Sequence, residues 1–472
     1  MRRFGRIWGC WCDMIEAVIH YVDGTVERIF IDEEDFKRAF PDLSFEEEES
    51  EDGREGVRVV EDEELEKQMS SFLVYDTGLA LDHALRLGRS GRCYYFVEYR
   101  TRYPRIEDYI TGYGFDSIVK VLDWGEVLDM VDTILMVDVG FGALNQILRK
   151  AGKYVFGSSP KGDMLELDRV YMIKVMRELG INTPNVQIFT GVDNLLDHVV
   201  DGKKQFLKLN IFRGNLETCP VYSRKEARVY LEQANFGAVE SELQFLLTDP
   251  VEGVEIGVDC FFNGKEFIRP YNWGNEVKGT GGQINKVVDN SIWDSVLDKI
   301  EPWLAETGYR GNISFEGIFD GSDIYVIDVT SRLFFPGSSI YPRFIENYAE
   351  VIAGVARGEY VEPEWENPYN CLLTAYRSDY NVWTRLVIDD AVSGNVAYPR
   401  GAVYVDGEIW IAPGDPIVAT IMGGGNTLDE AFRILYESCK GVSAVETTIA
   451  VEAVERYLRE YQAELERYGI TW

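Results

Sequence analysis

Histidine is scarce in this chain, with three in 472 residues, and none belongs to an HExxH-type pattern. This scarcity argues against catalysis driven by histidine proton transfer. Cysteine is also sparse, and its seven residues are scattered and odd in number, which argues against a disulfide framework. Cys10 and Cys12 are the one close pair, and without a second Cys/His pair nearby they do not predict a zinc site.

Positively charged residues are also few: the chain has 47 Lys and Arg residues against 80 Asp and Glu residues, and its net charge is −33. A chain without a basic surplus gains little from counterion release, so we do not expect duplex nucleic acid as a partner. A local cluster of cations can still hold a small anion. The sequence also lacks an apolar run of membrane-spanning length and a signal-peptide core, which predicts a cytoplasmic protein without a membrane partner.

Apolar residues make up 46% of the sequence, which is enough for several domain cores. Alternating strand and helix patterns predict an open parallel α/β domain in the first half, followed by α+β segments. We expect four segments: an N-terminal extension over residues 1–70, the α/β domain over residues 71–162, a middle α+β domain over residues 163–345, and a C-terminal α+β domain with a long last helix over residues 346–472.

Within the extension we expect a hairpin around Asp23-Gly24 and an acidic connector, solvated or disordered, over residues 46–52. The α/β domain has one glycine, Gly78, at its first strand-to-helix turn. A dinucleotide site needs the GxGxxG fingerprint and a following acid, so a nicotinamide- or flavin-dependent oxidoreductase is a weak alternative.

A hairpin near residue 320 carries the clearest chemical signal. Two runs rich in β-branched and aromatic residues flank Asp320-Gly321, a pair typical of two-residue turns with positive φ. Because side chains alternate along a strand, one face of this hairpin should present Glu316, Asp328, Thr330 and Arg332. Carboxylates and a hydroxyl are hard oxygen ligands that suit Mg²⁺. Taken alone, the same pattern also fits a solvated face with a surface ion pair.

The order of these groups along the chain resembles the ATP-grasp superfamily. Lys208 ends a strand before a turn, Glu252-Gly253-Val254-Glu255 follows another strand, and the acidic hairpin comes last. Within the superfamily, residues 72–455 are most similar to phosphoribosylamine–glycine ligase. Landmarks of this similarity are Asp76-Thr77-Gly78, Gly157-Ser158-Ser159-Pro160, Gly180 to Pro184, Thr280-Gly281-Gly282 and Gly424 to Ala431. The resemblance implies an ATP-grasp fold with an N-terminal open parallel α/β domain and a C-terminal α+β domain.

The resemblance also implies site residues. Those implied in ATP binding are Arg169, Lys208, Arg213, Gly214, Asn215, Leu247 and Glu255. Those implied in substrate binding are Asp76, Gly78, Lys278, Thr280, Gly281 and Gly282. Those implied in holding Mg²⁺, or Mn²⁺ in its place, are Glu316, Asp328 and Thr330. Arg332 and Lys208 are the implied catalytic cations, which neutralise charge on the phosphoryl groups. Arg169 stands where the family usually has a lysine, and Thr330 where it has an asparagine.

The implied activity is ADP-forming ligation of a small-molecule carboxylate, with an amino acid among the candidates, to an amine through an acyl-phosphate. Two departures bear on this. The turn after Lys208 carries a single glycine, and the loop 333–339 replaces an acidic segment of the family. The motifs on the nucleotide side match the family, whereas the loops on the substrate side differ from it, so the sequence does not identify either substrate. It does not predict the oligomeric state. The alternative is a nucleotide-binding sensor or scaffold of the same fold without ligase turnover.

Overall fold

The computed structural model describes strands within residues 1–69 and the chain from residue 70 to residue 470, apart from positions 100, 102, 104, 212–217, 235–236 and 278–280. The chain divides into two compact units, Met1–Ser70 and Ser71–Trp472. No helix in the described part of the chain is both long enough and apolar enough to cross a membrane.

The first unit is a five-stranded antiparallel sheet in the order β3-β2-β1-β5-β4. Its strands are β1 (Arg2–Cys10), β2 (Met14–Tyr21), β3 (Val26–Asp32), β4 (Ser44–Glu49) and β5 (Glu55–Val60). The pairing of β2 with β3 confirms the hairpin predicted around Asp23-Gly24. The predicted connector over residues 46–52 is wrong where β4 lies. There the backbone of Ser44–Glu49 pairs antiparallel with β5.

The second unit begins with a parallel sheet in the order β10-β9-β6-β7-β8, which confirms the predicted α/β arrangement. Its strands are β6 (Ser71–Asp76), β7 (Arg92–Val97), β8 (Val119–Lys120), β9 (Thr133–Met136) and β10 (Tyr154–Phe156), and its helices are α3 (Leu81–Ser90), α4 (Ile106–Ile110), η1 (Trp124–Met130) and α5 (Gly142–Lys150). Alternate strand residues enter two separate cores, with Val74 in one and Leu73 in the other, so the sheet is covered on both faces.

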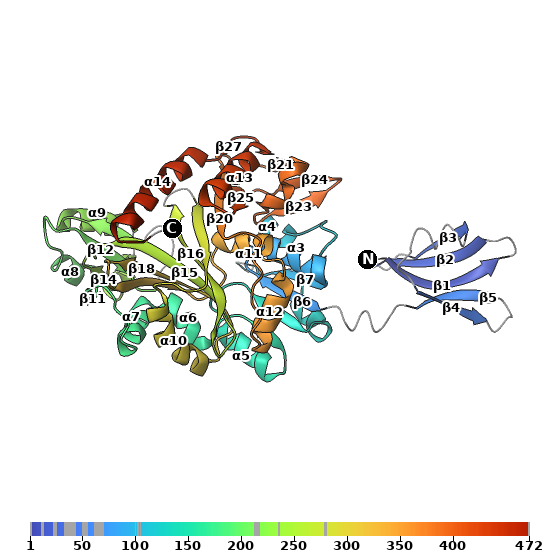
Figure 1. The fold of residues 1–472 in the computed structure, drawn as a ribbon, viewed down its shortest axis with the longest axis horizontal. Coiled ribbons are helices and arrows are strands. Elements are labelled where there is room, and N and C mark those ends of the chain that lie inside the picture. Colours follow the sequence, from blue (N-terminus) through green and yellow to red (C-terminus); the bar gives the residue numbers. More distant parts are fainter. Residues whose placement is uncertain are drawn as a thin grey trace. The chain divides into compact units, whose positions relative to one another are not determined.

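An antiparallel sheet in the order β11-β14-β12-β13 follows and has a core of its own, which includes Phe189, Leu207 and Phe245. Figure 1 shows this subdomain in green at one end of the second unit. Its elements are β11 (Val186–Thr190), α8 (Val192–Leu196), β12 (Gln205–Leu209), β13 (Thr218–Val221), α9 (Arg224–Ala234), η2 (Gly237–Val239) and β14 (Gln244–Thr248). Two helices, α6 (Pro160–Leu167) and α7 (Arg169–Glu178), precede it in the chain.

The largest sheet has nine strands, eight of them in the order β19-β18-β15-β16-β17-β20-β25-β22, with β27 paired to β20. These strands are β15 (Val254–Phe262), β16 (Phe267–Val277), β17 (Gly282–Val288), β18 (Gly311–Phe319), β19 (Ile324–Thr330), β20 (Tyr369–Arg377), β22 (Val396–Ala397), β25 (Ile417–Gly425) and β27 (Thr447–Thr448). The pairing of β17 with β20 carries one continuous sheet across residue 345, so the middle and C-terminal segments share a backbone hydrogen-bond network.

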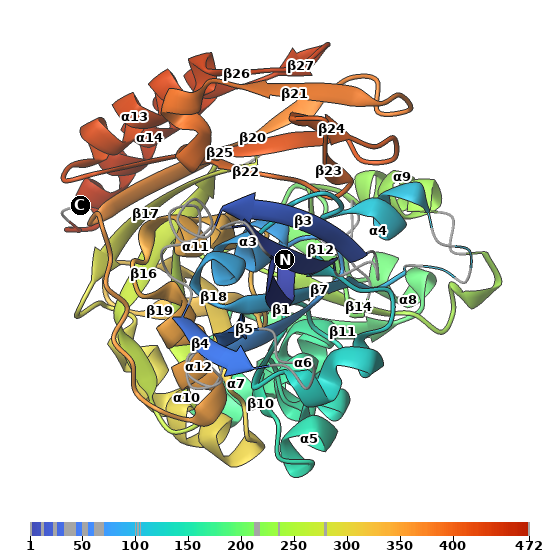
Figure 2. The same ribbon diagram turned by 90° about the vertical axis from the view of Figure 1, so that its right-hand side faces the viewer.

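The helices of this half are α10 (Asp294–Thr307), η3 (Gly337–Ser339), α11 (Ile340–Phe344), α12 (Tyr348–Arg357), η4 (Asp390–Asn395), α13 (Leu428–Lys440) and α14 (Val451–Arg467). Figure 1 shows α6, α7 and α10 on one side of the largest sheet and α13 with α14 on the other. A small sheet in the order β23-β24-β21-β26 completes the C-terminal part (Figure 2), with β21 (Thr384–Ile388), β23 (Ala402–Val405), β24 (Glu408–Ile411) and β26 (Val442–Ser443).

The glycine-rich stretch near residue 424 lies inside β25, where α13 packs directly on the strand backbone. A Cβ atom added at Gly423 would come within 2.2 Å of the Ala431 carbonyl oxygen and 2.4 Å of the Leu435 backbone nitrogen. Both contacts are with helix backbone, which cannot rotate away. Glycine at this position therefore sets the distance between helix and sheet.

We predict that Gly423→Ala lowers the free energy of unfolding by about 3 kcal/mol, because the new methyl group must push α13 off the sheet. Urea unfolding followed by circular dichroism measures the change. Gly394→Ala is the matched control, since an added Cβ there meets nothing within 4 Å, and its stability should stay close to that of the unmodified chain. Equal stability of the two variants would contradict this packing.

Candidate active site

The acidic hairpin predicted from the sequence is formed by β18 and β19, which pair antiparallel. Glu316 faces Asp328 in the register and Ser314 faces Thr330, so these four side chains share one face of the sheet. The connection differs from the predicted two-residue turn. The strands end at Phe319 and resume at Ile324, and a four-residue loop lies between them in which the backbone nitrogen of Asp320 donates to the Asp323 carbonyl oxygen.

Strand register extends this polar face over β15 and β16. One row across four adjacent strands contains Asn272, Asp259, Ser314 and Thr330. The next row, two residues along, contains Gly274, Gly257, Glu316 and Asp328. The β15 and β16 positions of the second row are glycines, so no side chain of these two residues stands beside Glu316 and Asp328 on the floor of the site.

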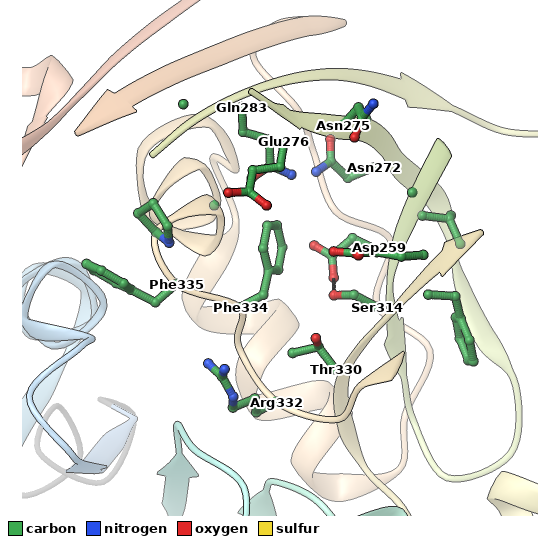
Figure 3. A pocket seen from close by; sticks show the side chains of 18 of the residues that line it. Asp259, Asn272, Asn275, Glu276, Gln283, Ser314, Thr330, Arg332, Phe334 and Phe335 are labelled. Carbon is green, nitrogen blue, oxygen red and sulfur yellow. Dashed lines mark hydrogen bonds between the residues drawn. The ribbon is translucent and has the colours of Figure 1, made fainter. Parts of the chain in front are cut away.

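A pocket of about 200 Å³ lies over this floor. Figure 3 shows its walls, with Glu276 and Gln283 on one side, Arg332 on the other, and the ring of Phe334 between them. The segment Phe334 to Gly337, in the loop that departs from the family pattern, lines the pocket together with the glycine pair Gly281-Gly282. A volume of this size suits a small metabolite and not a macromolecule.

Two cations reach the outer end of the acidic rows from neighbouring elements. The Nζ of Lys208, on β12, donates to the Ile327 carbonyl oxygen at 3.3 Å, one residue before Asp328. Arg169, the first residue of α7, is 5% exposed; its Nη1 donates to the Leu209 carbonyl oxygen at 2.8 Å and its Nη2 lies 3.8 Å from Asp328 Oδ2. The fold thus gathers Arg169, Lys208 and Asp328, which are far apart in the sequence.

Arg332, four residues after Asp328 and just past the end of β19, is held by two carboxylates. Its Nε lies 2.9 Å from Glu166 Oε1 and 3.2 Å from Asp138 Oδ1. The Glu166 side chain is fully buried and its Oε2 also accepts from the backbone nitrogen of Ser331 at 2.8 Å. Sequence reasoning assigned no role to either acid. Asp138 follows parallel strand β9, and the carboxyl ends of such strands are where sites form, so that signal was available; Glu166 on α6 gave none.

The residues predicted to bind the nucleotide base and ribose lie on strands β14 and β15. Leu247 is buried in β14, where it pairs with Leu207 of β12. Glu255 lies on β15 two and four residues before Gly257 and Asp259, and therefore on the same face as the pocket floor. Its carbonyl oxygen accepts from Asn275 Nδ2 at 3.1 Å and from the Tyr461 hydroxyl at 3.2 Å, which joins α14 to the site.

The residues predicted to bind substrate lie in two different parts of the structure. Asp76, the last residue of β6, is fully buried; its carboxylate accepts from the backbone nitrogens of Leu79 and Ala80 and from the Tyr95 hydroxyl, and so closes the turn. Gly78, in the same turn, has φ +94°, and the Arg400 guanidinium occupies the space where a Cβ would lie. Gly281 and Gly282 line the pocket instead. The residues predicted for the site that lie outside the described part of the chain are Arg213, Gly214, Asn215, Lys278 and Thr280.

No protein-family model matches the sequence. No curated protein matches it. Solved structures do match it. A phosphoribosylamine–glycine ligase from Thermotoga maritima has a TM-score of 0.60 at 16% identity, over 80% of this chain and 98% of that chain. The biotin carboxylase domain of a 2-oxoglutarate carboxylase from Hydrogenobacter thermophilus, in complex with MgADP and bicarbonate, has a TM-score of 0.59 at 13% identity, over 85% and 98%. An N5-carboxyaminoimidazole ribonucleotide synthetase from Thermotoga maritima has a TM-score of 0.53 at 13% identity, over 80% and 100%.

These proteins share the ATP-grasp architecture, and the chain has that fold, as the sequence predicted. A phosphoribosylamine–glycine ligase, the kind of ATP-grasp protein that the sequence motifs resemble, is among the matching structures. TM-scores of 0.53–0.60 establish the fold, whereas identities of 13–16% say nothing of the chemistry, which must be argued from the residues of the site.

The burial of Glu166 gives the first prediction for the site. Glu166→Gln should lower the free energy of unfolding by about 2 kcal/mol, because it replaces charge-assisted hydrogen bonds to Arg332 and Ser331 by neutral ones in a buried place. Asp138→Asn, at a side chain that is 23% exposed, should cost less than half as much. Urea unfolding measures both, and a larger loss for the Asp138 variant would contradict the arrangement.

Lys120 gives a second prediction, on pH. Its Nζ lies 4.9 Å from the centre of the Tyr95 ring, and burial lowers the pKa of Lys120 to about 8, outweighing the opposite effects of Asp76 and Asp108. The unfolded chain, with an ordinary lysine pKa, binds more protons above pH 8, so this site should raise stability by about 2–3 kcal/mol between about pH 7.5 and pH 10. Comparing Lys120→Met with the unmodified chain by urea unfolding at both pH values isolates the increment, and parallel pH profiles would contradict it.

Proposed function

We propose that the chain is an ATP-dependent carboxylate–amine ligase that forms an amide bond through an acyl-phosphate. The observation that carries the proposal is the register pairing of Glu316 with Asp328, with Lys208 and Arg169 both reaching the Asp328 end of that row. A solvated hairpin face with a surface ion pair would not be covered by cations from two separate elements. The ATP-grasp fold of the whole unit supports the same reading.

The donor set fits Mg²⁺, or Mn²⁺ in its place. Glu316 and Asp328 offer carboxylate oxygens from facing positions, Thr330 adds a hydroxyl on the same face, and magnesium typically takes one or two carboxylates and completes its octahedron with water and phosphate oxygens. When bound there, the ion would neutralise charge on the nucleotide phosphates. The biotin carboxylase domain among the matching structures was solved with MgADP, which is consistent with this assignment.

The reaction needs no side-chain nucleophile, which agrees with the scarcity of histidine. A substrate carboxylate oxygen attacks the γ-phosphorus of ATP, and ADP leaves. The nitrogen of the amine then attacks the acyl carbon, the C–O bond to phosphate breaks, and the amine gives up a proton. Lys208 provides positive charge beside Asp328 and Arg332 provides it two residues beyond Thr330, so the two cations flank this part of β19, and Glu166 with Asp138 fixes the orientation of Arg332.

The pocket has a volume of about 200 Å³, which favours small-molecule substrates. One wall of that pocket is the segment Phe334-Phe335-Pro336-Gly337, where the family has an acidic segment. Aromatic and proline side chains change both the shape and the charge of the wall. The proposal therefore does not extend to glycine and phosphoribosylamine as the pair of substrates.

Asp328→Asn tests the proposal, because it keeps the size of the side chain and removes the charge that faces Glu316. We expect ATP-dependent ADP release, measured by a coupled assay against a panel of carboxylates and amines, to fall at least about a hundredfold. Asp320→Asn, in the exposed loop of the same hairpin, is the matched control and should keep its activity.

Two results would overturn the proposal. Full activity of Asp328→Asn would remove the assigned role of the acidic row. Tight ATP binding by the unmodified chain, with no ADP release for any pair in the panel, would favour the sensor or scaffold alternative. Circular dichroism of each variant confirms that a loss of activity is not a loss of fold.

A further inference from the structure

Two polar residues of the pocket have no counterpart among the expected site residues. Asn272 and Asp259 continue the row of Ser314 and Thr330 onto strands β15 and β16. They are 2% and 5% exposed, yet both line the pocket (Figure 3). Side chains so deeply buried are usually apolar or fully hydrogen-bonded.

Their hydrogen bonding is incomplete. The Ser314 hydroxyl donates to Asp259 Oδ1, but Asp259 Oδ2 has no partner among the described residues, and neither does Oδ1 or Nδ2 of Asn272. A buried polar atom without a partner costs about 1–3 kcal/mol, so three such atoms at one wall of a pocket indicate groups that a ligand completes.

Charged side chains lie at both ends of the pocket, and Glu316, the carboxylate assigned to the metal, lines it on the strand between them. Arg332 is the one cationic side chain among the described lining residues, and it lies beyond Thr330 at one end. At the other end lie the carboxyl groups of Asp259 and Glu276 with the amide of Asn272. Burial raises the pKa of Asp259 well above its usual range because desolvation outweighs the hydrogen bond from Ser314, and a cation bound beside it would oppose that rise.

We propose that Asp259 and Asn272 bind the protonated amino group of the carboxylate substrate, which makes that substrate an amino acid. The inference rests on the proposed function for the carboxylate end and on the pocket for the amino end. A primary ammonium group offers three hydrogen-bond donors, and Asp259 Oδ2 and Asn272 Oδ1 are unused acceptors on adjacent strands.

The same chemistry assigns this amino group to the activated substrate and not to the attacking amine. A nucleophilic amine needs its lone pair free, whereas carboxylate and amide oxygens hold an amino group in its protonated form. The subsite therefore protects the amino group of the activated amino acid from reacting, while a second amine attacks from elsewhere. Asp259 and Asn272 are in this account specificity-determining residues.

The test compares acids that differ only in the amino group. The pairs are glycine with acetate, β-alanine with propionate, and 4-aminobutyrate with butyrate, each assayed for ADP release and, by calorimetry with a non-hydrolysable ATP analogue, for binding. We expect the unmodified chain to prefer the amino acid of at least one pair. Asp259→Asn should lower that preference, as a ratio of kcat/KM or Kd, by about 10- to 100-fold, the range for loss of a charge-assisted hydrogen bond.

Asn272→Ala is the second variant and should lower the same ratio, while Asp320→Asn, outside the pocket, should keep it. A ratio that stays the same in both pocket variants overturns the subsite. The two proposals fail separately. ADP release with amine-free acids alone keeps the ligase and rejects the subsite, whereas amino acid binding that depends on Asp259, without ADP release for any acid, keeps the subsite and rejects the ligase.

Discussion

The alignment of β15, β18 and β19 is the constraint on which the site depends. A slip of one residue would turn Glu316, Asp328 and Asp259 to the other face of the sheet. The opposite face prevents such a slip, because Val258, Phe315 and Val329 form a facing row that is at most 2% exposed. Burial of that apolar row in the main core fixes the polar rows above it, so the packing of the sheet and the geometry of the site are set by the same register.

The chain and its proposed nucleotide ligand are both negatively charged, and cationic side chains gathered at the site offset this repulsion. A net charge of −33 opposes the approach of a nucleoside triphosphate, yet Arg169, Lys208 and Arg332 come from three different segments to the same edge of the polar floor, before and after the residues Asp328 and Thr330 of β19. Each cation is held by a carboxylate or a carbonyl oxygen, which limits its movement before any ligand arrives. Preorganised charge of this kind stabilises developing charge without reorganisation, as phosphoryl transfer requires.

Local patterns predicted the parts of the site that lie within one stretch of sequence. The β18–β19 hairpin and the shared face of Glu316 and Asp328 follow from a period of two and a turn signal, and the ATP-grasp fold follows from the order of such signals. The contact of Glu166 with Arg332 spans 166 positions and has no local signature. In the sequence, Asp259 and Asn272 look like ordinary strand residues, and only the pairing of β15 with β16 brings them together. The acidic residues 46–49 do not have the sequence pattern of a strand, and they form one by pairing with β5.

The most direct test of the account is a crystal structure of the chain with ADP and Mn²⁺, with the ion located by its anomalous scattering. We expect an Mn²⁺ peak about 2.2 Å from carboxylate oxygens of both Glu316 and Asp328, with the nucleotide phosphates on its other side. Bound nucleotide with the ion at any other acidic residue, or with neither carboxylate in contact with it, would contradict the account.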